Sequence, residues 1–119
     1  MGRTTRGPDM GGEDMVERLG AEQRAEALAT LPGWKLASER EAIERTFRFA
    51  NFNQAWGFMS RVALVVEQLD HHPEWANVWN RVEVTLTTHD AGGLSALDVR
   101  LARAMDRIAA TTGELSPDA

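Results

Sequence analysis

Apolar residues recur along this chain with two different periods. In two long stretches they recur every three or four positions, which favours amphipathic helices, and in several short stretches every second position, which favours half-buried strands. The first long helix is expected to start at Asn53 as N-cap and to end around Asp70-His71, because Pro73 disfavours helical geometry at His72. Its apolar stripe comprises Ala55, Met59, Val62, Val66 and Leu69.

The second long helix follows Ser95-Ala96-Leu97-Asp98, which has the form of a capping box, and ends near Thr112-Gly113. Its apolar stripe comprises Leu97, Leu101, Met105 and Ile108. A shorter helix is predicted over residues 21–30 and is stopped by Pro32-Gly33.

Four short strands are predicted between the helices. They begin at Trp34, run over residues 42–49, run over residues 75–78, and continue after a Trp79-Asn80 turn through Val82, Val84 and Leu86. In residues 42–49 the apolar side is interrupted by Arg45. At the second turn, Asn80 is expected to take the left-handed conformation, which asparagine tolerates.

The element order predicts an α+β fold. Sequential hairpins give a four-stranded antiparallel sheet, with the two long helices on one face and the short helix at the N-terminal side. Residues 1–18 are expected to be a disordered leader without chemistry, residues 19–113 the domain, and residues 114–119 a tail. A sheet covered on one face leaves its other face and its edges open, so a homodimer or homotetramer is expected.

Composition removes several classes of function. The 119 residues carry a net charge of -5, which argues against nucleic acid as the partner. There is no cysteine, so disulfides, thiolate metal sites and cysteine nucleophiles are excluded. No apolar run approaches the ~18 residues of a membrane span, and no signal peptide is evident, so a cytoplasmic location without membrane contact is expected.

The candidate chemistry lies in three histidines. His71 and His72 are adjacent at the end of the first long helix, and His89 follows the last strand. Imidazoles supply an acid and a base near neutral pH without a cofactor, and the negative end of the helix dipole favours the charged imidazolium. A zinc site is the lesser alternative, because successive helix positions point about 100° apart and would converge poorly on one ion.

The segments around these histidines resemble the pterin-4a-carbinolamine dehydratase family. The resemblance covers roughly residues 19–112. It is carried by residues 67–75 (EQLDHHPEW), 77–82 (NVWNRV), 87–90 (TTHD) and 93–95 (GLS), by Asp98, by Gly33-Trp34, and by residues 47–63. Two positions depart from the family pattern: Ala76, where a larger residue is common, and Trp79, where tyrosine is commoner.

The resemblance implies a hydro-lyase that converts 4a-hydroxytetrahydropterin to quinonoid dihydropterin. This reaction recycles the pterin cofactor of aromatic amino acid hydroxylases, needs no metal or other cofactor, and makes such a hydroxylase a candidate partner. The implied catalytic residues are His71, His72 and His89. The implied substrate-binding residues are Glu67, Pro73, Thr88, Asp90, Asp98 and Trp34.

Several of these residues have plainer explanations. Asp98 could serve only as a helix cap, Glu67 could be a solvated helix residue, and Trp34 could belong to the core. For the histidines, we expect one of His71 and His72 to be the charged acid and His89 the neutral base. The alternative function is a non-catalytic scaffold or co-activator on the same fold, which has no physical need for the histidine set.

Overall fold

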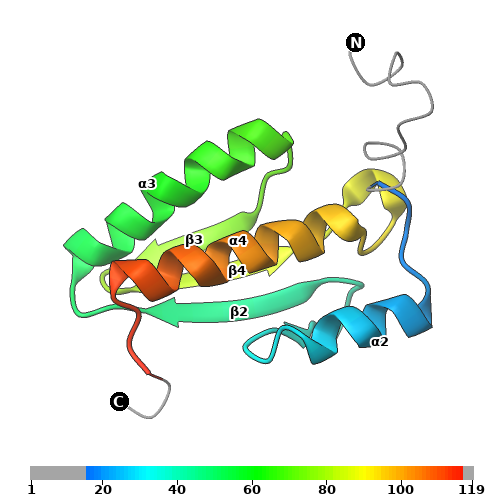
Figure 1. Cartoon of the computed structure of the whole chain (residues 1–119), viewed down its shortest axis with the longest axis horizontal. Helices are drawn as coiled ribbons and strands as arrows, with labels where there is room; N and C mark the ends of the chain where they lie inside the picture. Colours follow the sequence, from blue (N-terminus) through cyan, green and yellow to red (C-terminus); the bar gives the residue numbers. More distant parts are fainter. Residues whose placement is uncertain (1–15, 117–119) are drawn as a thin grey trace.

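The computed structural model describes residues 16–116 as three α-helices and four strands (Figure 1). The elements in chain order are α2 (Ala21–Ala29), β1 (Lys35–Leu36), β2 (Ile43–Arg48), α3 (Phe52–Leu69), β3 (Glu74–Val78), β4 (Arg81–Leu86), the 3-10 turn η2 (His89–Ala91) and α4 (Ala96–Thr112). The fold is α+β, as the sequence predicts. The first fifteen residues of the expected leader and residues 117–119 of the expected tail lie outside the described part.

The sheet is antiparallel throughout and has the strand order β1-β2-β4-β3. The two hairpins are therefore joined through β2 and β4, which pair along their whole length from Ile43↔Leu86 to Arg48↔Arg81. Figure 1 shows α3 and α4 running side by side over one face of the sheet, with α2 beside β2. Because of the strand order, β3 forms one edge of the sheet and β1 the other.

The core lies between the sheet and the two long helices. Alternation along β2 and β4 buries Ile43, Phe47, Val82, Val84 and Leu86. The helices contribute Phe58, Val62, Leu101 and Met105, all fully buried. Phe58 packs its ring 4.7 Å from that of Phe47 and 5.1 Å from that of Phe49. This packing holds α3 and α4 over the sheet. It thereby fixes the position in space of the last turn of α3 and the first turn of α4.

Two local predictions were wrong. The N-cap of α3 is Asn51, not Asn53: Asn51 is extended, and its side chain accepts a hydrogen bond from the amide of Gln54 at 2.9 Å. The left-handed residue of the β3–β4 turn is Trp79, with φ of 52°, rather than Asn80. Asn80 instead donates its side-chain amide to the carbonyl of Phe49 at 2.7 Å, a contact that ties the turn to the end of β2.

Between residues 16 and 116, none of the helices combines the length and the apolar character needed to cross a lipid bilayer.

Candidate active site

The antiparallel pairing of β3 with β4 brings the three histidines to one end of the sheet. Glu74, the first residue of β3, pairs with Thr85, close to the end of β4. The residues just before β3 and just after β4 must therefore be neighbours. The first group contains His71 and His72, and the second contains His89. The left-handed C-cap Asp70 ends α3 immediately before the histidine pair.

A cavity of about 290 Å³ opens at this end of the sheet. That volume is close to the lower limit of small-molecule sites. Its lining residues are Val16, Asp70, His71, His72, Thr87, Thr88, His89, Asp90 and Leu97. All three histidines thus line a single cavity, although His89 lies far from the other two in the sequence.

Behind the cavity lies a fully buried carboxylate, that of Asp98, in the first turn of α4. Its Oδ1 atom lies 2.6 Å from Nε2 of His71. Its Oδ2 atom accepts a hydrogen bond from the Thr88 hydroxyl at 2.7 Å and another from the Ser95 amide at 2.9 Å. Three donors compensate for the burial of this charge, which would otherwise be costly.

The direction of each hydrogen bond in this network follows from Asp98, because an ionised carboxylate can only accept. Thr88 donates its single hydroxyl proton to Asp98. In the 2.5 Å contact between Thr88 Oγ1 and Ser95 Oγ, the Ser95 hydroxyl is therefore the donor. The Leu97 amide in turn donates to Ser95 Oγ. His71 donates its Nε2–H to Asp98, which leaves Nδ1 as the ring nitrogen that Asp98 does not engage.

The other two histidines are far more exposed. His72 lies with Nε2 3.5 Å from Oε1 of Glu67, but both side chains are mostly in solvent, so this contact is weak. His89 is exposed and opens the η2 turn, whose geometry is fixed by the hydrogen bond from the Gly92 amide to the His89 carbonyl. The site therefore combines one buried imidazole, hydrogen-bonded to a carboxylate, with two imidazoles open to solvent.

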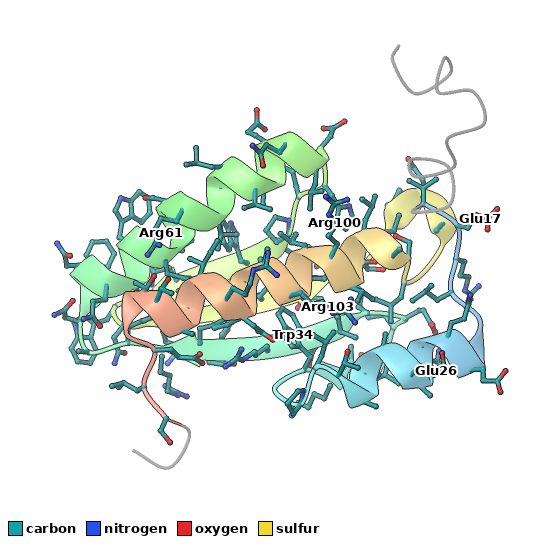
Figure 2. All side chains as sticks on the ribbon, in the orientation of Figure 1. Glu17, Glu26, Trp34, Arg61, Arg100 and Arg103 are labelled. Atoms are coloured by element: carbon teal, nitrogen blue, oxygen red, sulfur yellow. The ribbon has the colours of Figure 1, made fainter. Side chains whose placement is uncertain are left out.

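The sequence-predicted binding residues lie in four different places relative to the cavity. Thr88 and Asp90 line the cavity, whereas Asp98 lies behind it. Glu67 and Pro73 do not line it, although Glu67 lies beside His72. Trp34 is elsewhere: Figure 2 shows it beside the middle of α4, where its indole N–H donates to Asp106 at 2.9 Å.

Sequence reasoning missed four lining residues: Val16, Asp70, Thr87 and Leu97. Asp70 and Thr87 lie within the motif segments, so their neighbours in the sequence were the available signal. Val16 carries no motif at all, and only its place in space reveals it. Among the described residues, no three histidine or carboxylate side chains are placed to hold a metal ion together.

The chain is similar to known proteins of one family. A family model described as pterin 4 alpha carbinolamine dehydratase matches residues 17–108. A Bradyrhizobium sp. (strain ORS 278) protein named "Putative pterin-4-alpha-carbinolamine dehydratase" is 65% identical over 96 residues, 81% of this chain and 96% of that protein. A protein of the same name from Novosphingobium aromaticivorans is 65% identical over 91 residues, 76% of this chain and 95% of that protein.

A crystal structure described as transcriptional coactivator/pterin dehydratase from Brucella melitensis superposes with a TM-score of 0.77. It is 50% identical and covers 78% of this chain and 99% of that chain.

Proposed function

Because this chain belongs to the pterin 4 alpha carbinolamine dehydratase family, we propose that it dehydrates 4a-hydroxytetrahydropterin to quinonoid dihydropterin and water. The observation that supports this reaction best is the convergence of His71, His72 and His89 on one cavity. Loss of water needs a proton delivered to the leaving hydroxyl and a proton taken from N5 of the pterin. Two imidazoles in opposite protonation states can do both.

His71 is the proposed general acid. Its Nε2–H is held by the buried Asp98 carboxylate, whose negative charge stabilises an imidazolium and fixes the ring's orientation. The imidazolium gives up the proton on Nδ1, the ring nitrogen that Asp98 does not engage, to the 4a hydroxyl; the C4a–O bond breaks, and water leaves.

His89 is the proposed base. It is exposed, and among residues 16–116 no carboxylate contacts it as Asp98 contacts His71. It removes the N5 proton, and the electron pair of that N–H bond forms the N5=C4a double bond of the quinonoid product. His72, beside Glu67, and Asp90 also line the cavity, whereas Pro73 follows His72 without lining it.

Stopped-flow absorbance of 4a-hydroxytetrahydropterin decay, with and without the protein, tests this proposal. We expect the native protein to accelerate the decay, and His89→Ala to lower kcat about 100-fold or more while KM changes little. The control is Arg48→Ala, because Arg48 is exposed and lies at the end of β2 that is farther from the cavity. This variant should retain full turnover. Absence of acceleration by the native protein would overturn the function, and an unchanged kcat for His89→Ala would overturn its role.

The proposed physiological role is recycling of the pterin cofactor of aromatic amino acid hydroxylases in the cytoplasm, by a homodimer or homotetramer. Support for assembly comes from apolar side chains left exposed on α3 and at the β3–β4 turn: Phe52, Trp56, Leu64, Val78 and Trp79.

A second function, as a co-activator or scaffold, is favoured by the description of the Brucella melitensis structure and by the same apolar residues. The histidine cavity distinguishes the two functions, because a scaffold would keep its partner binding in a His89→Ala variant that has lost turnover.

A further inference from the structure

The capping box at the start of α4 does not use the hydroxyl proton of its serine. As N-cap, the Ser95 side chain accepts hydrogen bonds from backbone amides, among them that of Leu97 at 3.2 Å. Its proton goes out of the helix to Thr88 Oγ1, 2.5 Å away. We propose that Ser95 is a positioning residue for the proposed acid His71 and acts on it through Thr88 and Asp98. This inference rests on the proposed function and extends it to a residue outside the cavity lining.

Three hydrogen bonds in series connect Ser95 to the imidazole. The Ser95 hydroxyl donates to the Thr88 hydroxyl, which donates to Oδ2 of Asp98 at 2.7 Å. The other carboxylate oxygen, Oδ1, accepts from Nε2 of His71 at 2.6 Å. The proton from Ser95 occupies the acceptor side of the Thr88 oxygen and so keeps the Thr88 proton directed at Asp98. Because bonds in such a series polarise and strengthen one another, loss of the first bond should loosen the last.

The series lies in the interior of the protein. Ser95 and Asp98 are fully buried, and the Thr88 side chain is almost as inaccessible. In such a place a hydrogen bond is stronger, and an unpaired polar group is costlier, than at the surface. Burial therefore favours a single arrangement of the Asp98 carboxylate and, with it, of the His71 ring.

Backbone pairing brings Ser95 against Thr88, although the two are seven positions apart. Thr88 and Gly93 form an isolated antiparallel bridge, in which the Thr88 amide donates to the Gly93 carbonyl at 2.8 Å. A Cβ atom at Gly93 would lie 2.6 Å from Cγ of Glu41, so glycine at this position leaves room for that side chain. The bridge closes the loop that carries His89 and holds it against the N-cap of α4.

The alternative is that Ser95 serves only as a helix cap. Threonine and glycine separate the two roles, because they are N-caps of similar quality but only threonine carries a hydroxyl group. A pure cap predicts the same turnover for Ser95→Thr and Ser95→Gly. A positioning role predicts that Ser95→Thr keeps most of the turnover and that Ser95→Gly does not.

Stopped-flow decay of 4a-hydroxytetrahydropterin tests the inference. We expect Ser95→Gly to lower kcat about three- to tenfold, the rate equivalent of one hydrogen bond, and to change KM less than about twofold. Ser95→Thr should rescue kcat to within about twofold of native. The control is Asn51→Gly, the same change at the N-cap of α3, which should leave kcat unchanged. Thermal unfolding of each variant gives the folded fraction by which its kcat is corrected.

A second pair of variants tests the route through Thr88. Thr88→Val keeps the shape and removes the hydroxyl group, so we expect kcat to fall about tenfold or more. Thr88→Ser restores the hydroxyl group and should recover most of this loss. Because Ser95 acts through Thr88, Ser95→Gly combined with Thr88→Val should be no slower than Thr88→Val alone. This comparison decides the matter even if the added methyl group of Ser95→Thr prevents folding.

The outcomes separate the two proposals. A native protein without activity would overturn the proposed function together with this inference. An active native protein would overturn the inference alone in either of two cases: equal corrected kcat for Ser95→Gly and Ser95→Thr, or effects of Ser95→Gly and Thr88→Val that multiply in the double variant. Loss of kcat confined to variants without the hydroxyl groups, with no further loss in the double variant, supports it.

Discussion

Asp98 serves two purposes because a carboxylate has two oxygen atoms. The sequence left open whether it caps α4 or belongs to the site, and each oxygen takes one of these tasks. Oδ2 closes the capping box through the Ser95 amide, and Oδ1 receives the Nε2–H of His71. The capping motif was readable from residue spacing alone, but the contact with His71 joins positions 27 apart and needed the folded chain.

Replacing Asp98 with asparagine should therefore separate the effect of the carboxylate's charge from the effect of its size and shape. An asparagine side chain has nearly the same size and keeps one acceptor, but its amide would face His71 Nε2 with a donor and remove the charge that stabilises the imidazolium. We expect kcat to fall about 100-fold or more, with a modest loss of stability. Stopped-flow assays and thermal unfolding measure the two effects. Asp106→Asn, the same change outside the site, should leave kcat intact, and equal activities of the two variants would contradict the assignment.

At the scale of elements, the helix and strand positions followed from periodicity, and the errors lie at the ends of elements. Asn51 and Asn53 are two residues apart and either could cap α3. The choice depends on Gln54, whose amide binds Asn51 and whose side-chain oxygen accepts from the Ala50 amide at 3.1 Å. Local sequence does not rank these two arrangements, so the cap was misplaced by two residues.

This pair of asparagines provides its own control. Asn51→Ala removes the N-cap hydrogen bond and should lower the free energy of unfolding by about 1 kcal/mol. Asn53→Ala, at an exposed position inside the first turn, should change it by less than about 0.5 kcal/mol. Urea unfolding of the two variants measures the difference. Equal effects, or a larger effect at Asn53, would show that α3 starts elsewhere.

The interruption of β2 by Arg45 also has a structural explanation at this scale. Arg45 lies on the core side of β2 and pairs with Asp106 of α4 and with Glu114, just beyond α4. Burial is the largest influence on Glu114 and raises the pKa of its carboxyl group, although Arg45 opposes the shift. Glu74, the first residue of β3, shows the opposite shift: the hydrogen bond from Arg40 lowers the pKa of its exposed carboxyl group.

These two carboxyl groups should affect stability with opposite signs as pH changes. With its pKa raised, Glu114 favours the folded state most below its unfolded pKa, and this contribution is lost as pH rises through the folded pKa. With its pKa lowered, Glu74 contributes above its unfolded pKa and loses that contribution as pH falls through the folded pKa. Urea unfolding between pH 3 and 7 of Glu114→Gln and Glu74→Gln, each against the native protein, should show differences of opposite slope. Parallel slopes would refute this account.

For the whole molecule, the α+β class was predictable, because hairpins and amphipathic helices are local patterns. The pairing of β2 with β4, which sets the strand order, joins the two hairpins and is not a local pattern. The exposed apolar residues could not be recognised either, since Trp56 and Leu64 read as helix residues like those of the core. On α3, the Trp56 ring stacks on that of Phe52 with centroids 6.0 Å apart, and both remain substantially exposed.

Assembly into a homo-oligomer would remove this apolar surface from water. We expect Trp56→Ser to shift the protein towards a monomer, with at least about a tenfold weaker association, because large aromatics contribute most at interfaces. Sedimentation velocity over a range of concentrations measures the shift. Leu115→Ser, which also removes an exposed apolar side chain but at the C-terminal side, should leave assembly unchanged. A native protein that is already monomeric would refute the expectation.

The two contacts of Asp98 link the proposed active site to the fraying of one helix end. If the first turn of α4 opens, even briefly, the Ser95 amide loses its acceptor and His71 loses its counter-charge in the same event. Hydrogen–deuterium exchange at the Ser95 amide would then report the fraction of time for which the proposed active site is broken, and warming should lower the proposed activity at temperatures where the sheet is still intact.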